Sequence, residues 1–237
     1  PTERGAAPYS NWNELIYHHC YKPNTDLRNF ERISFNIGPT LLDWMEENYP
    51  ETVLEIIRQA NCNFEKFGVS NALAQPYHHT ILPLSKREDK ITQIQWGINN
   101  FIKRFGHSPS GMWLPEAAVD LESLEIMADF GIEFTILAPW QADTVDLDVS
   151  QPYWIELPNH KKIGVFFYHQ ELSTQISFDP FSTVNADRFA EDKVLPLFKK
   201  YNLNDTPKYI LVASDGELYG HHQPFRDQFL DHLMNGA

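Results

Sequence analysis

The stretch GMWLPEAAVDLESLEIMADFGIEFTILA, residues 111–138, contains the pattern that decides the fold class. It begins with an apolar, β-prone run, Gly111–Leu114, and ends with another, Phe134–Ala138. Between them, residues 121–130 place apolar side chains at helical spacing, and Gly131 follows as a helix terminator. Because a helix commonly connects two parallel strands, this stretch predicts an α/β fold with a parallel sheet.

The same alternation extends toward the N-terminus. Residues 33–37 are β-prone and lead through Gly38-Pro39 into a predicted helix, and residues 71–74 form another apolar segment. A loop over residues 75–84 follows.

A long helix is predicted after this loop. Ser85 and Glu88 have the spacing of a capping box, and Gly106 is placed to end the helix. Its predicted buried face consists of Ile91, Ile94, Ile98, Phe101, Ile102 and Phe105.

The C-terminal half continues with strand-like segments. Residues 154–157 and 163–168 predict a hairpin, or two closely spaced strands, across Asn159-His160. Tyr209–Ala213 is an apolar run typical of a strand buried on both faces. Two helices complete the prediction: residues 187–201, kinked at Pro196, and a helix after Pro224.

This pattern fits either an open doubly wound sheet or a closed (β/α) barrel. A glycine-rich phosphate loop is absent from the sequence, which weakens the open-sheet alternative. Polar residues instead follow strand-like segments, as at the carboxyl-end face of a barrel. These residues are His78, His79, Glu116, Asp215, Glu217, His221 and His222. We therefore expect a single barrel domain over residues 1–237.

Composition excludes several classes of protein. The 237 residues are 42% apolar and 22% charged, which excludes a disordered chain. A net charge of −13 disfavours nucleic acid as a partner, and no apolar run is long enough to span a membrane. Two cysteines, Cys20 and Cys62, predict reduced thiols and a cytoplasmic protein. The chain opens on Pro1 instead of methionine, so a removed signal peptide stays an open alternative.

Carboxylates at two strand ends are the main candidates for chemistry. Pro115 lacks an N–H and should end its strand, leaving Glu116 at the rim of the sheet. Asp215 and Glu217 would point to the same side if the backbone stays extended at Gly216. The alternatives are a solvated loop glutamate and an aspartate that caps a turn.

Two facing carboxyl groups are what cleavage of a glycosidic bond requires, one as a proton donor and the other ionised. Aromatic side chains that could stack on sugar rings are interleaved with the candidate polar residues along the sequence, although for any one of them taken alone core packing is the better explanation. They are Tyr77, Trp113, Trp140, Trp154 and Tyr219.

These motifs resemble glycoside hydrolase family 57. GMWLPE at 111–116 is similar to the family's nucleophile segment, and DGELYGH at 215–221 is similar to its acid/base segment. HTILPL at 79–84 and SFNIGP at 34–39 resemble two further segments. The resemblance implies an incomplete (β/α)7 barrel and a retaining glycosidase or transglycosylase that acts on α-glucans or related α-linked sugars without a cofactor or metal.

The resemblance also implies residue roles. It assigns Glu116 as nucleophile and Asp215 as general acid/base, with carboxyl oxygens about 5 to 7 Å apart across one cleft. The expected substrate-binding residues are His79, Trp113, Glu217, Tyr219 and His221, and the expected partner is a carbohydrate.

One family segment has no good match in this chain. The first motif, a His-x-x-His-x-Pro-like segment on the first barrel strand, is poorly matched by YHHCYKP at 17–23. We therefore expect the first strand to lie upstream of Pro1, and the domain to continue beyond residue 237.

Two other functions stay open. The first is a metal-dependent deacetylase or mannosidase-like hydrolase, whose metal ligands would come from the histidines and Asp215. Adjacent residues on a strand point to opposite faces, so the pairs His78-His79 and His221-His222 would each supply only one ligand. A noncatalytic carbohydrate-binding barrel is the other alternative.

Overall fold

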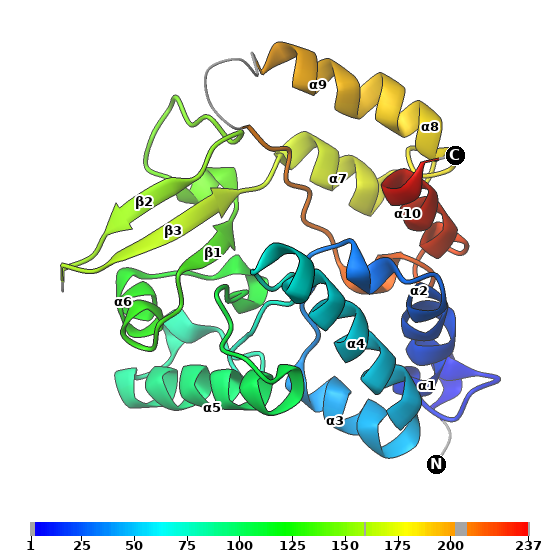
Figure 1. Ribbon diagram of the computed structural model, residues 1–237, viewed down its shortest axis with the longest axis horizontal. Coiled ribbons are helices and arrows are strands. Elements are labelled where there is room, and N and C mark those ends of the chain that lie inside the picture. Colours follow the sequence, from blue (N-terminus) through cyan, green and yellow to red (C-terminus); the bar gives the residue numbers. More distant parts are fainter. Residues whose placement is uncertain (1–2, 159, 202–207, 237) are drawn as a thin grey trace.

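Helices pack against a small sheet in the computed structural model, which describes residues 3–158, 160–201 and 208–236. Figure 1 shows the sheet and α6 (Leu121–Asp129) on one side of the molecule, and α1 (Trp12–Ile16), α2 (Lys22–Asp26) and α10 (Arg226–Asn235) on the other. α4 (Pro50–Phe67) runs from the centre of this view toward the lower right, and α3 (Pro39–Asn48) and α5 (Arg87–Phe105) lie along the bottom.

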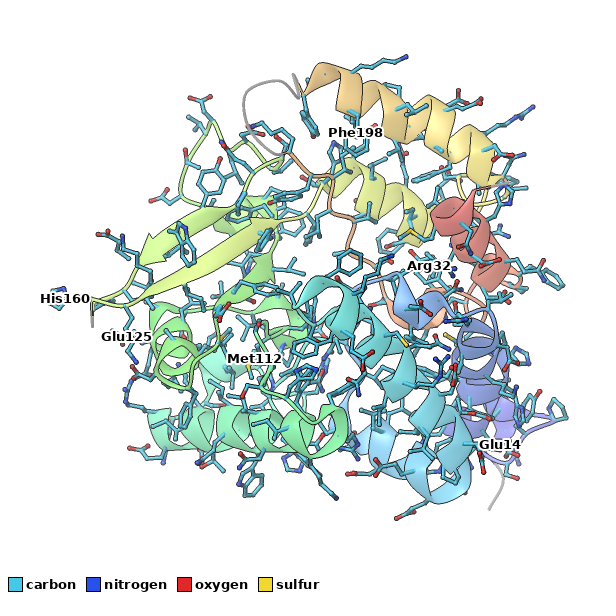
Figure 2. All side chains as sticks on the ribbon, viewed as in Figure 1. Glu14, Arg32, Met112, Glu125, His160 and Phe198 are labelled. Carbon is cyan, nitrogen blue, oxygen red and sulfur yellow. The ribbon has the colours of Figure 1, made fainter. Side chains whose placement is uncertain are left out.

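The sheet has three strands in the order β1-β3-β2. β1 (Phe134–Leu137) pairs in parallel with β3 (Lys162–Phe167), and β2 (Tyr153–Glu156) pairs with β3 in the antiparallel direction. The predicted hairpin is thus confirmed. Its turn residue Asn159 lies outside the described residues, and His160 projects at the tip (Figure 2).

The parallel arrangement extends beyond β1 through single bridges. Phe35 pairs with Ala72, Ala74 with Met112, and Gly111 with Phe134, all in parallel. The predicted strands at 33–37, 71–74 and 111–114 are therefore present only as bridges, shorter than the sequence suggests. Since all of these segments run the same way as β1 and β3, their carboxyl ends meet along one edge, which we call the carboxyl edge.

The helix boundaries follow the sequence closely, with two corrections. α3 begins at Pro39 as predicted, and α5 ends at Gly106, whose φ of 79° is left-handed. The α5 N-cap is Lys86 instead of Ser85, with no side-chain capping bond, so the capping box is wrong. Ile102 is 39% exposed because it lies at the rim of the apolar face.

Near the C-terminus, the predicted helix over 187–201 forms in two parts, α8 (Ala186–Phe189) and α9 (Leu195–Lys200), joined by a π-helical turn at 190–194. Pro196 lies in the first turn of α9, where a missing N–H is tolerated. α7 (Gln170–Phe178) packs nearby (Figure 1), and α10 follows Pro224 as expected.

The predicted strand Tyr209–Ala213 is wrong. Residues 208–214 carry no strand pairing in the structure and are only half-buried. β3 already pairs with β1 along one side and with β2 over residues 162–165 on the other. The segment contacts β3 through a side chain, because the hydroxyl of Tyr209 accepts the N–H of Phe167 (3.3 Å), and forms further bonds past the end of the strand. There, the N–H of His169 donates to the carbonyl of Leu211 (2.7 Å), and the N–H of Ala213 donates to Oγ of Ser173 (3.1 Å).

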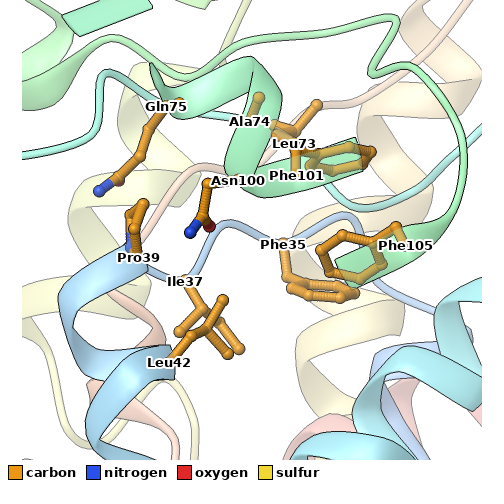
Figure 3. A pocket seen from close by; sticks show the side chains of 11 residues that line it. Phe35, Ile37, Pro39, Leu42, Leu73, Ala74, Gln75, Asn100, Phe101 and Phe105 are labelled. Atoms are coloured by element: carbon orange, nitrogen blue, oxygen red, sulfur yellow. The ribbon is translucent and has the colours of Figure 1, made fainter. Parts of the chain in front are cut away.

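Two apolar clusters hold the molecule together. The main core joins α3 to α6 with the parallel segments and includes Met112, which is fully buried (Figure 2). It contains one small cavity of about 20 Å³ between α3, α5 and the segments at 35–37 and 73–75 (Figure 3). The smaller cluster consists of Leu172, Ile176, Ala186, Phe189, Leu218 and Phe229.

Cys20 and Cys62 are both unpaired, as predicted. Among the described helices, none combines the length and the apolar character needed to cross a membrane.

Candidate active site

Glu116 stands at the carboxyl edge in an unusual backbone conformation. The apolar segment before it ends at the fully buried Leu114, and residues 115–117 form a 3₁₀ turn. Inside this turn Glu116 has a φ of 56° and Ala117 a φ of 52°. Left-handed conformations of this kind are unfavourable for residues other than glycine and cluster at functional sites. They leave the Glu116 side chain 72% exposed.

His79 makes direct contact with Glu116. Its Nε2 lies 3.1 Å from Oε1 of Glu116, and its own φ is 55°, so two strained residues face each other. The sequence singled out both residues but assigned His79 to a sugar hydroxyl. The hydrogen bond between them carries no sequence signal, because it joins positions 37 residues apart.

The turn at Glu116 is also tied to the loop that follows β1. Nε2 of Gln141 donates to the carbonyl of Ala117 (2.6 Å), and Oε1 of the same side chain accepts from the N–H of Ala138 (2.7 Å). Gln141 therefore connects the carboxyl end of β1 to the Glu116 turn.

Asp215 and Glu217 lie on a 3₁₀ turn instead of extended backbone. Residues 216–218 are helical, and the N–H of Leu218 donates to the carbonyl of Asp215 (3.2 Å). The expectation that both acids point to one side depended on extended backbone at Gly216, so that argument fails. The Asp215 side chain is exposed and makes no capping bond.

Glu217 and the histidines near it are electrostatically coupled. Burial raises the pKa of Glu217, His222 opposes this shift and Asp215 adds to it. Nε2 of His222 lies 3.9 Å from Oε2 of Glu217. The pKa of His221 is lowered by burial and by the neighbouring His222 and His19.

The Asp215 loop, residues 215–223, rests on the N-terminal helices. Gly220 has a φ of 128°, and a Cβ at this position would lie 2.0 Å from the carbonyl oxygen of His19, so only glycine fits. Nδ2 of Asn24 donates to the carbonyl of Tyr219 (2.8 Å), and its Oδ1 accepts from the fully buried Asn29 (2.8 Å). The sequence offered no signal for these asparagines.

The 17–23 segment, a poor match to the family's first motif, thus forms part of the support beneath the Asp215 loop. Residues 17–21 are a π-helical turn, and Sγ of Cys20 donates to the carbonyl of Gly216 (3.3 Å). Burial raises the pKa of the Cys20 thiol to about 12.

The predicted aromatic residues separate into different environments. Tyr219 bonds through its hydroxyl to Oγ of Ser214 (3.0 Å), and Trp113 is half-buried beside the carboxyl edge. Trp140 follows β1 and is 64% exposed. Trp154 pairs with Gly164 near the amino end of β3, away from this edge, and the hydroxyl of Tyr77 is bonded to Asp43.

An open groove of about 550 Å³ lies where β1 and β3 end and α7 begins. Its lining combines apolar side chains, among them Pro139 and Val149, with polar ones. His169 uses Nδ1 to accept the N–H of Leu172 (3.3 Å), and Oε1 of Gln175 is buried without a partner. The lining residues are Pro139, Val149, His169, Gln170, Glu171, Thr174 and Gln175.

Within the described residues, no three His, Cys, Asp or Glu side chains lie close enough together to hold a metal ion. The His78 imidazole is engaged elsewhere, because its Nδ1 lies 3.1 Å from Nε2 of Gln93.

Comparisons with known proteins agree on one family. The sequence profile described as Glycosyl hydrolase family 57 matches residues 3–236. The chain is 30% identical to Alpha-amylase 1 of Dictyoglomus thermophilum over 228 residues, 90% of this chain and 30% of that protein. It is 24% identical to 4-alpha-glucanotransferase of Thermococcus litoralis over 214 residues, 87% of this chain and 30% of that protein. The chain therefore spans less than a third of the length of these relatives.

Solved structures show the same fold. The crystal structure of the Thermococcus litoralis 4-alpha-glucanotransferase has a TM-score of 0.74 at 21% identity, covering 96% of this chain and 35% of that one. A GH57-type branching enzyme of Pyrococcus horikoshii has a TM-score of 0.69 at 17% identity, covering 92% and 61%. A putative polysaccharide deacetylase of Mycobacterium smegmatis has a TM-score of 0.60 at 14% identity, covering 90% and 70%.

Proposed function

The chain belongs to glycosyl hydrolase family 57, and from this premise we propose that it carries the catalytic centre of a retaining enzyme that hydrolyses or transfers α-linked glucan units. The relatives named above include an α-amylase, a 4-alpha-glucanotransferase and a branching enzyme, which supports an α-glucan as the substrate. Two unpaired thiols support a reducing compartment, the cytoplasm.

The observation that carries the proposal is the environment of Glu116. A carboxylate on a strained turn, exposed at the carboxyl edge and bonded to a histidine at 3.1 Å, has the features of a positioned nucleophile. The open groove at the ends of β1 and β3, whose lining includes His169, Gln170 and Glu171, supports binding of a sugar chain at this edge.

In the proposed reaction, the protonated carboxyl of Asp215 gives its proton to the glycosidic oxygen while Glu116 attacks the anomeric carbon. The bond to the leaving sugar breaks, and a covalent glycosyl-enzyme forms on Glu116. Asp215, now ionised, takes a proton from water or from an acceptor hydroxyl, which displaces Glu116. Water gives hydrolysis and a sugar hydroxyl gives transglycosylation.

Neighbouring residues would assist these steps. An Nε2–H of His79 that donates to Oε1 of Glu116 would leave the other carboxylate oxygen for attack. Glu217, Trp113, Tyr219 and His221 would bind sugar hydroxyls and faces, and Asp215 is close enough to Glu217 to help raise the pKa of Glu217.

We also propose that the parallel segments belong to a (β/α)7-type barrel whose first strand lies upstream of Pro1. The bridges at Phe35, Ala74 and Gly111 support a parallel array longer than the three-stranded sheet. The fold shared with the Thermococcus litoralis enzyme supports the same architecture.

The test uses the full-length protein with a panel of α-glucans. Wild type should release or transfer sugar with retention of anomeric configuration, and Glu116→Gln should lower turnover by about 10³-fold. A fluorinated glucosyl fluoride should label the wild type covalently on the peptide containing Glu116, as read by mass spectrometry. Unchanged turnover by Glu116→Gln would refute the mechanism, and binding of glucan without turnover by wild type would make the protein a carbohydrate-binding barrel.

A further inference from the structure

The loop that carries His79, residues 75–79, lies directly on α5. The carbonyl oxygen of Gln75 approaches Gly97 so closely that a Cβ there would be 1.9 Å away. Gln75 and Pro76 are buried, whereas His78 and His79 at the end of the loop are exposed. Figure 3 shows Gln75 beside Pro39 and Asn100 at one end of the small cavity between α3 and α5. The loop is thus anchored at its start, and its exposed end needs a separate support.

Gln93 supplies that support from α5. Its Oε1 accepts the N–H of His78 (2.9 Å), and its Nε2 lies 3.1 Å from Nδ1 of His78. Since an amide NH₂ only donates, Nδ1 of His78 accepts this bond and the ring proton is on Nε2. The backbone carbonyl of Gln93 also accepts the N–H of Tyr77 (3.1 Å). One helical residue therefore fixes two consecutive loop residues.

A second anchor connects the loop to α3. The hydroxyl of Tyr77 donates to Oδ2 of Asp43 (3.0 Å), and Oδ1 of Asp43 accepts from Arg104 (2.6 Å). The Arg104 side chain is 2% exposed and also binds Glu46 (2.8 Å). Because the buried guanidinium of Arg104 forms a charge-assisted bond to Asp43, the Tyr77 hydroxyl has an acceptor that is held in place.

His79 follows these anchors immediately. Its N–H donates to the carbonyl of Pro76 (3.2 Å), closing a turn that leaves its φ at 55°, and its imidazole reaches Glu116. Both side chains of this pair are more than half exposed, so no surrounding core fixes them. Their mutual geometry depends on the backbone of the 75–79 loop.

We propose that Gln93 is a positioning residue for the reaction: by clamping His78 to α5 it fixes the turn that presents His79 to Glu116. This inference rests on the proposed function, because it assumes that the His79–Glu116 contact matters for chemistry. Gln93 touches neither Glu116 nor a sugar in this arrangement and acts only through the loop. A displacement of about 1 Å at a reacting group can lower a rate by about 10²-fold.

The test compares three variants of the full-length protein. Gln93→Leu keeps the approximate volume and removes both side-chain bonds to His78, and it should lower kcat about ten-fold with KM nearly unchanged. Gln93→Glu keeps an acceptor for the N–H of His78 but loses the amide that donates to Nδ1, so it should recover part of the activity that Gln93→Leu loses. Gln95→Leu, on the exposed face of the same helix, is the matched control and should match wild type.

A readout independent of activity completes the design. Hydrogen–deuterium exchange of the peptide covering residues 76–84 should rise at least several-fold in Gln93→Leu while the melting temperature stays near that of wild type. Tyr77→Phe, which removes the second anchor, should raise the same exchange and lower kcat by a smaller factor.

The outcomes separate the two hypotheses. Wild-type kcat in Gln93→Leu overturns the positioning role, and so does a loss of activity that simply follows a lowered melting temperature. If exchange rises as expected but Glu116→Gln itself retains full turnover, the loop is held as described and the proposed function is what fails.

Discussion

Glu116 and Asp215 follow two regions that are built in different ways. Glu116 follows a segment that bonds to parallel neighbours on both sides and belongs to the main core. Asp215 follows a segment without strand pairing, beside the smaller cluster around Leu218. Its loop is held by the side chain of Asn24, 195 positions earlier than Tyr219.

The proposed nucleophile and the proposed acid/base can therefore depend on separate structural supports. The backbone ladder and α5 position the Glu116 side, whereas buried amide groups from the N-terminal helices position the Asp215 side. Substitutions in one region should therefore impair one chemical step more than the other.

The largest effect should come from removing each acid and changing the leaving group. Asp215→Ala should lose about 10³-fold on a natural glucan but far less on a glucosyl fluoride, because fluoride departs without protonation. Glu116→Ala should lose comparable activity on both substrates. Steady-state kinetics on the two substrates makes the comparison, and equal losses by Asp215→Ala on both would remove the acid role from this residue.

A smaller effect should come from adding a methyl group at the glycine where each loop packs against its supporting helix. Gly97→Ala pushes the 75–79 loop away from α5, and Gly220→Ala pushes the Asp215 loop away from His19, each lowering the free energy of unfolding by about 1–3 kcal/mol. Denaturant unfolding measures this change, with Asn99→Ala on the exposed face of α5 as the control.

The same two glycine variants should differ in which step of the proposed reaction they slow. Gly97→Ala should slow covalent labelling at Glu116, whereas Gly220→Ala should spare labelling by a fluoride reagent and slow turnover of natural glucan. Identical kinetic profiles for the two variants would contradict the separation of supports.

The smallest effect concerns pH and Glu217. Burial raises the pKa of Glu217 above its ordinary value of 4.5, so the folded state binds a proton more tightly than the unfolded state does. Glu217 therefore favours folding below pH 4.5, and this contribution is lost as the pH rises through the raised pKa.

Glu217→Gln, which stays neutral, should gain stability relative to wild type as the pH rises through this window, by no more than about 1 kcal/mol because the side chain is 36% exposed. Chemical unfolding at pH 4 and pH 7 measures the difference. A pH-independent difference would mean that Glu217 titrates normally.

The two regions also differ in how far the sequence predicts them. Around Glu116, local patterns predict where the elements end. Pro115 ends the strand segment, Gly131 follows the end of α6, and polar residues follow apolar ones at the carboxyl edge. Around Asp215, the apolar run at 209–213 predicted a strand, yet this segment contacts β3 through the Tyr209 side chain instead of a backbone ladder. The extended backbone assumed at Gly216 failed because nothing in the local sequence distinguishes it from the 3₁₀ turn.

Contacts between distant segments were beyond sequence reasoning altogether. His79 was expected to bind sugar, and its hydrogen bond to Glu116 emerges only when two loops meet. The roles of Asn24 and Gln93 depend on backbone groups that no side-chain pattern reveals. The family-based assignment of Glu116 and Asp215 stays a prediction until the variants above are measured.

The bond from Cys20 to the carbonyl of Gly216 allows thiol labelling to report on the motion of the Asp215 loop. A buried thiol with a pKa of about 12 scarcely ionises, so alkylating reagents should react with it only when the contact between residue 20 and residue 216 opens. Cys62, half-buried on α4, provides an internal reference within the same polypeptide. The ratio of the two labelling rates would then follow, without any engineered probe, how often the Asp215 loop lifts from the helices beneath it.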